Sequence, residues 1–447
     1  MAQTTLEEDF ADGTPARTAR RATLEASRYT DPAVMVPEWQ QIWTRCWLFA
    51  GLASDIPDAG DFFVFDLGRE SIVVLRDDSG TVRAFYNVCQ HRGNRIFASR
   101  AGSVARIACP YHGWSYALDG VLQEVPDGQR FSPVVDHSER SMKPVRVAEW
   151  AGMVRLSMDP GGPSLEQYLG PIMDRLAPFR FENMLLAKHQ TVLLDANWKT
   201  ARDNFLEQYH VDFIHPQHAS LVDCCNATNI LWPHGHSAAM VRGYVTDSRY
   251  PVPEKTPDHL VPLLQGVGLS PGDFDGRVAE IRQVMQQRKR QVGILLGFDY
   301  SGLSDEQVTD VWQYDIFPNT FMTIQAEELW IYGPRPHPSD PDKCFFDKWT
   351  LQIPLEVGAD PDRGLSLNPR LQASQQDERP PHEVFTAQDV IEGRHSLTVT
   401  LDQDIHYLAD MQAGMHSRGF DSAVLNRDEE RVQHFHDWVD HYLKVGD

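Results

Sequence analysis

The chain has 447 residues, enough for two or three domains, and its 42% hydrophobic and 23% charged residues are ordinary for a soluble globular protein. The formal net charge of −22 argues against nucleic acid as a partner, because phosphate binding depends on clustered Lys and Arg. The sequence contains no run of about 18 apolar residues, and its acidic N-terminus lacks an apolar core. We therefore expect neither a membrane-spanning helix nor a secretory signal, and hence a cytoplasmic protein.

The first part of the chain favours short strands. A polar tail and a helical segment near residues 39–43 are followed by runs rich in Val, Ile, Phe and Tyr. A turn at 77–80 makes a hairpin of two of these runs, and an Asp-Gly pair at 119–120 marks a second hairpin. The predicted strands are residues 62–65, 71–76, 81–87, 114–118 and 121–125.

The second part mixes helices and strands. Asn197 can cap a helix that begins at the next residue, and residues 276–295 and about 420–443 are predicted to be helical. Residues 250–274 and 355–382 are rich in Pro, Gly and Asp, which is typical of loops over an active site or of disorder. Strands are predicted at 188–194, 320–324, 328–332 and 346–353.

Two short motifs each supply one cysteine and one histidine. Cys89-x-His91 and Cys109-x-x-His112 fall beside strand ends or turns, so two tight loops can each present a thiolate and an imidazole. Six cysteines in a chain without a signal indicate reduced thiols and metal ligands rather than disulfides. This ligand set suits either a structural zinc ion or a [2Fe-2S] cluster in which two histidines replace two cysteines on one iron. The residues by themselves leave both readings open.

A second pair of histidines lies in the segment NWKTARDNFLEQYHVDFIHPQH, residues 197–218. If a helix runs from Trp198, Glu207 and His210 lie three residues apart on one face of it. His215 precedes a proline, which disfavours the α conformation there and lets the chain turn His215 back toward His210. Two histidines presented in this way need one carboxylate to complete a 2-His-1-carboxylate site for Fe(II).

Together the two motifs resemble those of the Rieske non-haem iron oxygenases, the catalytic (α) subunits of ring-hydroxylating and demethylating oxygenases. CQHRG…CPYHGW is similar to the Rieske motif, and NFLEQYH-x4-H is similar to the mononuclear-iron motif of that family. The resemblance spans roughly residues 40 to 440 and is strong at the two motifs. It implies an α+β fold with an N-terminal helical segment at 1–45 that packs on the catalytic domain, an all-β Rieske domain at 46–165 and a helix-grip catalytic domain at 166–447.

The resemblance also implies the ligands of two metal centres. The cysteines of the first motif would hold one iron of a [2Fe-2S] cluster, and its histidines would hold the other. His210 and His215 would bind the mononuclear Fe(II). The family takes its third iron ligand from an aspartate at the start of a downstream helix, where Asp404 matches best and Asp402 is the fallback. The carboxylate that connects the two centres in the family corresponds to Glu207, where many relatives have Asp.

The implied function is that of a terminal oxygenase. The chain has no convincing dinucleotide-binding motif, so electrons from NAD(P)H would arrive through a separate ferredoxin or reductase. The Fe(II) would activate O₂ to hydroxylate an aromatic or related small organic substrate. The subunits are expected to form a homotrimer, with or without a separate β subunit, in which Glu207 links His210 to His112 of the partner subunit.

Two other functions stay open. The same machinery carries out oxidative N- or O-demethylation, including of quaternary ammonium substrates. The alternative from another class is a non-catalytic electron-transfer or zinc-binding protein. Position along the chain suggests several aromatic pocket residues, although packing in the core is the better expectation for each of them. These residues are Phe205, Phe213, Trp232, Phe321 and Trp330.

Overall fold

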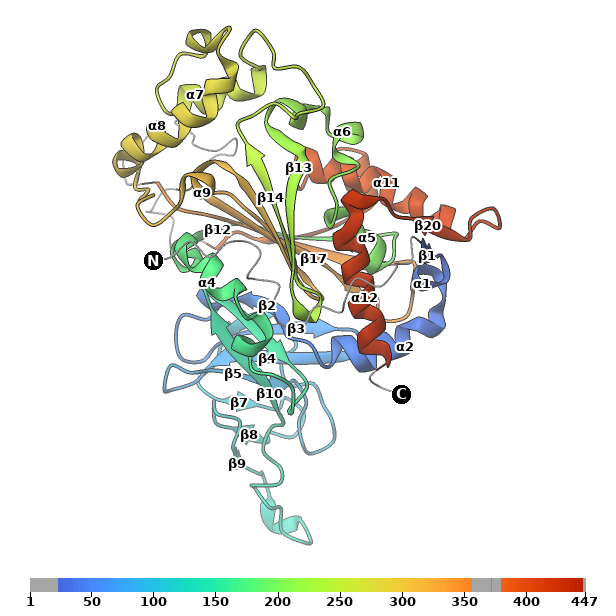
Figure 1. The fold of residues 1–447 in the computed structure, drawn as a ribbon. Helices are drawn as coiled ribbons and strands as arrows, with labels where there is room; N and C mark the ends of the chain where they lie inside the picture. Colours follow the sequence, from blue (N-terminus) through green and yellow to red (C-terminus); the bar gives the residue numbers. More distant parts are fainter. Residues whose placement is uncertain (1–22, 356–370, 372–378, 445–447) are drawn as a thin grey trace. The chain divides into compact units, whose positions relative to one another are not determined.

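The computed structural model describes residues 23–355, 371 and 379–444 (Figure 1). The chain folds as two compact units, a smaller one of Trp39–Gly170 and a larger one of Met1–Glu38 with Pro171–Asp447. Most of the irregular segment expected at 355–382 lies outside the described residues. Within the described part of the chain, no helix is long and apolar enough to cross a membrane.

The small unit is built mainly from strands, as predicted. Seven strands form an antiparallel sheet in the order β2-β11-β10-β5-β4-β3-β6, and three short strands form a second sheet, β7-β8-β9. Cys89 and Cys109 belong to a buried hydrophobic cluster that also contains Phe85, Trp114 and Tyr116, so both metal motifs are anchored in the core. The elements are β2 Leu48–Leu52, β3 Asp61–Leu67, β4 Glu70–Arg76, β5 Val82–Tyr86, β6 Ala101–Ser103, β7 Ile107–Ala108, β8 Ser115–Tyr116, β9 Leu122–Glu124, β10 Pro144–Trp150, β11 Met153–Ser157 and the helix α3 Leu165–Leu169.

Both predicted hairpins are confirmed. In the turn between β4 and β5, the Asp77 carboxylate accepts a hydrogen bond from the Ser79 N–H at 2.9 Å, and Gly80 adopts a φ of 80°. β8 and β9 pair across a turn that contains Gly120, with a φ of 85°. A Cβ atom at Gly120 would lie 2.4 Å from the Phe85 ring. The second turn therefore requires glycine both for its backbone conformation and for its contact with the core.

One eight-stranded sheet organises the large unit. Its order is β13-β14-β15-β16-β17-β18-β12-β19, and all neighbouring strands are antiparallel except β12 and β19. The four strands predicted in this region are confirmed as β12, β16, β17 and β18. A separate strand pair, β1 with β20, joins segments from near the two ends of the described chain. The strands are β1 Thr23–Glu25, β12 Leu185–Leu194, β13 Val222–Leu231, β14 Ser237–Gly243, β15 Val311–Ile316, β16 Thr320–Ile324, β17 Glu328–Pro336, β18 Cys344–Gln352, β19 His382–Thr386 and β20 Ser422–Val424.

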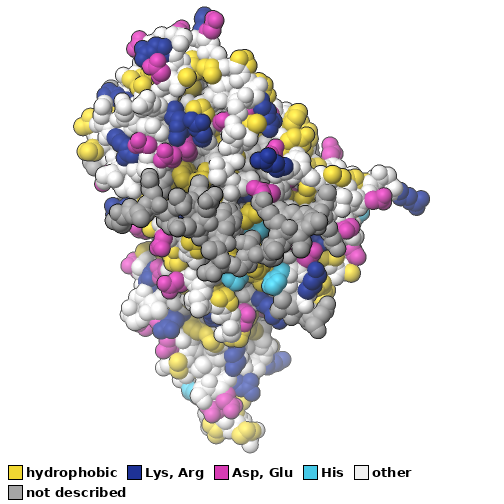
Figure 2. Space-filling view, in the orientation of Figure 1, with side chains coloured by type: hydrophobic (Ala, Val, Ile, Leu, Met, Phe, Trp, Pro, Cys, Tyr) yellow, Lys and Arg dark blue, Asp and Glu magenta, His cyan; other side chains and the backbone are white. Residues whose placement is uncertain are grey.

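Three helices lie along this sheet (Figure 1). α5 contacts β17 and β18, α11 contacts α5 and β12, and α12 contacts β13. On the face seen in Figure 2, positive and negative side chains are interspersed over the region of α7 and α8. The helices of the large unit are α1 Ser27–Thr30, α2 Met35–Glu38, α4 Ile172–Leu176, α5 Trp198–Phe205, α6 Val211–Ile214, α7 Val261–Gly266, α8 Ile281–Leu296, α9 Asp305–Thr309, α10 Ala387–Ile391, α11 Val399–Met415 and α12 Glu430–Lys444.

The helix expected from Trp198 through His210 is shorter than predicted. Asn197 caps α5 by accepting from the Lys199 N–H at 2.9 Å, as the sequence indicates, but the helix ends at Phe205. The Glu207 carboxylate instead accepts a hydrogen bond from the His210 N–H at 3.1 Å. A side chain that binds local backbone in this way competes with a continuous helix. The placement of Glu207 and His210 on one face of a single helix was therefore wrong.

The predicted C-terminal helix also begins later than expected. Ser422–Val424 forms the strand β20, and α12 begins at Glu430. Asn426 accepts a hydrogen bond from the Asp428 N–H at 2.6 Å, while Glu429 accepts one from the Asn426 N–H at 2.7 Å. These reciprocal bonds form a capping box that starts the helical segment, and the residues before it are free to pair with β1.

A buried ion pair ties α5 to α2. The Lys199 ammonium lies 2.5 Å from one oxygen of Glu38, and Trp198 Nε1 donates to the other oxygen at 2.8 Å. The two charged side chains are only 1% and 4% exposed. Burial lowers the pKa of Lys199, and the Glu38 carboxylate opposes that change because it favours the ammonium form. Each charge therefore depends on the other.

Replacing Glu38 by alanine leaves the Lys199 ammonium buried without its counter-ion. We expect the free energy of unfolding to fall by about 3–5 kcal/mol, as measured by denaturant titration. The matched control is Glu280→Ala, which breaks an exposed ion pair with Arg277 and should leave the stability unchanged. Equal stability of Glu38→Ala and the wild type would contradict a structural role for the buried pair.

Candidate metal centres

The two cysteine-histidine motifs form loops of the same design. In each loop the cysteine carbonyl accepts a hydrogen bond from the glycine N–H four residues later, at 3.0 Å for Cys89 and 3.1 Å for Cys109. In each, the cysteine N–H donates to the carbonyl five residues later, at 2.8 Å. Gly93 and Gly113 have φ values of 75° and 72°, a conformation that favours glycine. The different spacings within the two motifs therefore lead to equivalent tight turns.

The ligand atoms of these loops fall into two pairs. The side chains of Cys89 and Cys109 are both buried, and burial together with the nearby Cys109 thiol raises the pKa of Cys89. The Nδ1 atoms of His91 and His112 lie 3.1 Å apart on half-buried rings. Burial, followed by the nearby His112 ring and Arg92, lowers the pKa of His91, which favours the neutral imidazole that binds a metal.

This pairwise arrangement distinguishes between the two metals left open by the sequence. A tetrahedral zinc site brings four ligand atoms to one centre, so that all of them lie within about 4 Å of one another. Among the described residues, no three of these four ligand atoms lie within 4.8 Å of one another. A sulfur pair beside a nitrogen pair is what a two-iron cluster with one thiolate-bound and one imidazole-bound iron requires. The site therefore fits a [2Fe-2S] cluster better than zinc.

Aromatic side chains support both pairs. The Tyr116 hydroxyl accepts a hydrogen bond from the Gln90 N–H at 3.1 Å and lies 3.4 Å from the Cys89 sulfur. Because the oxygen already accepts from Gln90, its proton is available to the sulfur. The Trp114 ring stacks on His91 with a centroid distance of 4.9 Å and an interplanar angle of 5°. Neither contact was predicted, since both depend on how β8 and the segment beside it pack against the first loop.

A second group of ligands converges in the large unit. His210 precedes α6, His215 follows it, and Asp404 lies on α11. One oxygen of Asp404 lies 3.0 Å from His215 Nε2 and 3.6 Å from His210 Nε2. The ligand atoms of the three residues all lie within 4.8 Å of one another. His215 and Asp404 are buried, while His210 is partly exposed. Two imidazoles and one carboxylate around one point fit a facial Fe(II) site.

The fallback ligand, Asp402, lies elsewhere. Its carboxylate accepts hydrogen bonds from Ser396 Oγ at 2.5 Å and from the Leu397 N–H at 2.9 Å, so it holds the loop before α11. Residues that share one face of a helix are three or four positions apart. Asp402 and Asp404 are only two positions apart, so their side chains point to different faces. The structure thus brings Asp404, and not Asp402, to the two histidines.

Neighbouring side chains orient both histidines. Gln403 Oε1 lies 2.8 Å from His215 Nδ1, so Nδ1 carries the proton and Nε2 faces Asp404 as a free acceptor. The Glu207 carboxylate hydrogen-bonds to His210 Nδ1 in the same manner. Burial alone lowers the pKa of His210, but Glu207 and then Asp404 outweigh it, and the pKa is raised. Gln403 was not anticipated from the sequence, because its role appears only once the fold brings it to His215, 188 residues away in the chain.

The three ligands line a cavity of about 140 Å³ in the large unit. A second cavity, of about 330 Å³, shares several wall residues with the first, including His218 and Trp330. His218 accepts or donates a hydrogen bond with Thr400 Oγ1 at 3.0 Å, and burial lowers its pKa to about 4. The two cavities therefore adjoin each other along these shared walls. Other lining residues of the first cavity include Phe205, Gln208, Val222, Cys224, Val311, Gln313, Thr323, Gln325 and Tyr332.

Of the five aromatic candidates, Phe205 and Trp330 line the cavity. Phe213 is 70% exposed, and Trp232 and Phe321 are buried in the core, so these three are not among the lining residues. The glutamines of the wall were missed, because an isolated polar residue on a predicted strand gives no signal of facing a cavity.

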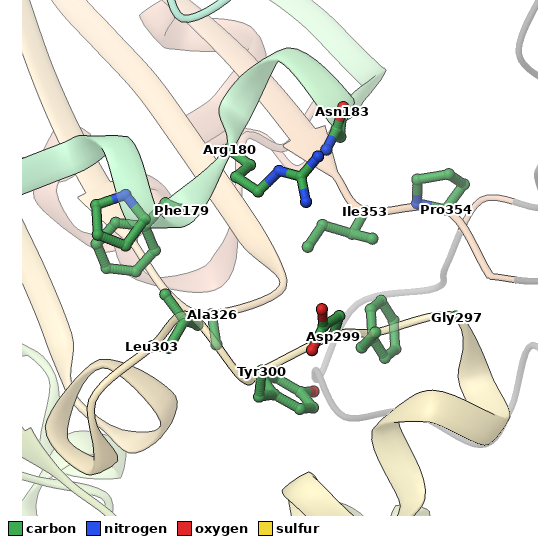
Figure 3. Close-up of a pocket in the computed structure, with 12 residues that line it drawn as sticks. Phe179, Arg180, Asn183, Gly297, Asp299, Tyr300, Leu303, Ala326, Ile353 and Pro354 are labelled. Carbon is green, nitrogen blue, oxygen red and sulfur yellow. The ribbon is translucent and has the colours of Figure 1, made fainter.

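A larger cavity, of about 460 Å³, lies elsewhere in the large unit (Figure 3). Arg180 and Asn183 lie near one another on one wall, and Asp299 and Tyr300 lie on the other. Its described lining residues include none from either metal motif. We therefore assign the functional site to the smaller cavity, because it contains the converging metal ligands, and not to the cavity with the larger volume.

Comparison with known families identifies the family to which the chain belongs. Residues 181–445 match the family described as ring hydroxylating alpha subunit (catalytic domain), and residues 46–142 match the Rieske [2Fe-2S] domain. The chain therefore belongs to the ring-hydroxylating alpha subunit family. A Rieske [2Fe-2S] cluster and a mononuclear iron are the metal centres of such a protein, and the expected α+β architecture with an all-β Rieske domain is confirmed.

Characterised relatives are similar over part of their length. The chain is 36% identical over 189 residues to the oxygenase subunit of glycine betaine monooxygenase from Chromohalobacter salexigens, which is 42% of each chain. It is 33% identical to the oxygenase subunit of carnitine monooxygenase from Escherichia coli K12, over 43% of this chain and 52% of that one. The matches thus span about half the length of these relatives.

Solved structures share the fold over nearly the whole chain. A quaternary ammonium Rieske monooxygenase in complex with L-carnitine has a TM-score of 0.65 at 20% identity, covering 94% of this chain and 95% of that one. Naphthalene 1,2-dioxygenase from Rhodococcus has a TM-score of 0.63 at 20% identity, covering 94% of each. The same architecture therefore occurs in enzymes named for very different substrates.

Replacing Tyr116 by phenylalanine removes the hydroxyl beside the Cys89 sulfur. A hydrogen bond to a cluster ligand stabilises the more negative, reduced state, so we expect the reduction potential of the cluster to become more negative. The change should reach up to about 60 mV, equivalent to about 1.4 kcal/mol for one electron. Redox titration followed by EPR measures it. Tyr111→Phe, at an exposed tyrosine of the Cys109 loop, is the control. An unchanged potential in Tyr116→Phe would refute the contact.

Proposed function

We propose that the chain is the terminal oxygenase component of a multicomponent enzyme. The observation that carries this proposal is the convergence of His210, His215 and Asp404 in a cavity of a chain that also holds a Rieske domain. Three protein ligands on one face of an iron leave positions for O₂ and for a substrate beside it. A purely electron-transferring or zinc-binding protein has no need of a second ligand set in a cavity.

Each centre has a ligand assignment in this proposal. Cys89 and Cys109 hold one iron of the cluster, and His91 and His112 hold the other. His210, His215 and Asp404 hold the mononuclear Fe(II). When bound, these groups supply one-electron transfer and O₂ activation next to an organic substrate.

The remaining cavity residues prepare this chemistry. Gln403 and Glu207 keep the free nitrogen of each histidine turned toward Asp404. Phe205, Trp330 and Tyr332 provide apolar walls that keep water away from the reacting groups. The buried Asp404 carboxylate offsets part of the positive charge of the bound ion.

The electrons come from other proteins in this proposal. A separate reductase or ferredoxin delivers them from NAD(P)H, because the sequence has no convincing dinucleotide-binding motif. We further propose a homotrimer, with or without a β subunit. In it Glu207 connects His210 to His112 of the partner subunit. The Glu207 carboxylate already binds His210 of its own chain, which supports one half of that connection.

For the substrate, the broad proposal is hydroxylation of an aromatic or related small organic compound. Oxidative demethylation of a quaternary ammonium compound is the second candidate. Aromatic faces attract such cations, and Phe205, Trp330 and Tyr332 line the cavity. The Lys348 ammonium lies 5.1 Å from the Trp330 ring centroid, which leaves only the other face of that ring for a ligand. Relatives named for glycine betaine, carnitine and choline also support this candidate.

Product analysis separates these two reactions. The holoenzyme with a surrogate reductase is supplied with aromatic acids, phenyl ethers and methylated amines. Stoichiometric formaldehyde from a methylated amine identifies demethylation, whereas a hydroxylated ring without formaldehyde identifies ring oxidation. NAD(P)H oxidation without any oxygenated product from the panel would count against both.

His215→Ala tests the mononuclear centre. We expect the variant to keep the visible absorption of the cluster, to contain about one iron fewer per chain and to lose product formation altogether. His406→Ala is the matched control, since His406 is an exposed histidine two residues from Asp404 on the same helix, and it should behave like the wild type. A His215→Ala protein with full iron content and turnover would contradict the ligand assignment.

Glu207→Ala tests the connecting carboxylate. This variant should retain both metal centres, as shown by iron analysis and EPR, yet lose product formation by at least about tenfold because the loss of one positioned side chain commonly costs that much. Glu207→Asp keeps a carboxylate at the position and should preserve part of the turnover. Normal product formation by Glu207→Ala would remove Glu207 from the electron path.

A further inference from the structure

Arg431 is a fully buried cation that the oxygenase chemistry does not use. It lies at the start of α12, and its side chain is 0% exposed. Its guanidinium stacks over the Phe321 ring at 5.5 Å, and Nε donates to Ser237 Oγ at 3.1 Å. Burial lowers its pKa to about 9, which reflects the cost of keeping this charge away from water.

Three other buried cations of the large unit have carboxylate partners, whereas buried Lys348 donates to Thr350 Oγ1 and the Leu397 carbonyl instead. Lys199 pairs with Glu38, Arg202 with Asp315 and Lys289 with Glu327. These are the pairs that burial normally requires. Among the described residues, no carboxylate forms an ion pair with Arg431, and its Nη2 atom has no hydrogen-bond partner. A buried charge without a counter-ion destabilises the folded protein, so its presence calls for an explanation, such as a functional role.

Arg431 is connected to the iron cavity through Gln313. Its Nη1 donates to Gln313 Oε1 at 3.4 Å, and Gln208 Nε2 donates to the same oxygen at 2.7 Å. Both glutamines line the cavity that contains His210 and Asp404. Because a guanidinium only donates hydrogen bonds, the oxygen of Gln313 must face Arg431. The amide orientation is therefore fixed by the cation behind it.

This orientation leaves the NH₂ group of Gln313 as a donor at the cavity wall. No acceptor among the described residues is paired with its Nε2 atom. Hydrogen bonding to a cation also polarises the amide, which strengthens its remaining N–H groups as donors. The two acids of the cavity already have partners, since Glu207 binds His210 and Asp404 lies against both histidines. Glu207 and Glu430 act on Arg431 electrostatically, but neither forms a direct ion pair with it. The free donor and this buried cation without a direct counter-ion thus favour an incoming anion.

We propose that Gln313, backed by Arg431, forms a subsite for a carboxylate group of the substrate. The inference rests on the oxygenase function proposed above and narrows its substrates to organic acids or zwitterions. A neutral hydrocarbon or an alcohol would leave the amide and the guanidinium without an acceptor. The subsite would also fix which carbon of a small acid lies nearest the iron ligands.

Ligand pairs that differ at one group test the subsite. Glycine betaine and choline share a trimethylammonium group, and benzoate and benzyl alcohol share a phenyl ring. Only the first member of each pair has a carboxylate. Calorimetry on the oxidised, metal-loaded protein without reductase gives the dissociation constants. In at least one pair, the carboxylate should bind about tenfold or more tightly than the alcohol, the effect of a charge-assisted hydrogen bond.

Gln313→Leu should bring the ratio of the two dissociation constants close to one in that pair. Gln325→Leu is the matched control, because Gln325 lines the same cavity without Arg431 behind it, and it should keep the preference. Arg431→Met should weaken the preference as well, and its melting temperature is recorded because it alters the core. The near-isosteric Gln313→Leu keeps the test decisive if Arg431→Met is unstable.

Absence of a preference in both pairs, or an unchanged preference in Gln313→Leu, would overturn the subsite. Either result leaves the oxygenase proposal standing, because binding is measured without turnover. Conversely, missing mononuclear iron or missing product would refute the oxygenase proposal and leave the binding preference as a separate result.

Discussion

The contact between the Asp404 carboxylate and His215, 3.0 Å between Oδ1 and Nε2, is the interaction on which the large unit depends. It joins the segment after α6 to α11 across 189 residues of sequence, and both side chains are buried. Burial of the Asp404 carboxylate is unfavourable without a compensating positive charge. A divalent ion bound by this carboxylate and the two imidazoles would supply that charge. The early end of α5 and the contact of Gln403 with His215 help to position His210, His215 and Asp404 around one point.

Several other buried charges of the large unit also have partners of opposite charge or histidine partners. Lys199, Arg202 and Lys289 each face a buried carboxylate, and the acids of the cavity face histidines. Lys348 and Arg431 are exceptions, and Arg431 lies directly behind the cavity wall. The small unit handles charge differently: its two thiols lie in an apolar cluster, while its histidines are nearer the surface. The buried and exposed ends of that site match the two kinds of ligand in a Rieske cluster.

The sequence alone predicted the features that depend on contacts between residues close together in the chain. The cysteine-histidine loops, both hairpins and the Asn197 cap involve residues only a few positions apart, so their spacing carried the prediction. Features set by tertiary packing were missed or only implied by family resemblance. The early end of α5 depends on the Glu207 carboxylate binding backbone, and the link from Arg431 to Gln313 joins residues 118 positions apart. No periodicity in the sequence encodes either contact.

One chain is proposed to hold two iron centres of different kinds, one with paired ligands and one with converging ligands. Quantification of iron, zinc and acid-labile sulfide in the purified holoprotein tests this proposal. We expect about three irons and two sulfides per chain, with negligible zinc. Stoichiometric zinc without sulfide would contradict the cluster, and two irons with two sulfides in the fully loaded protein would contradict the mononuclear centre.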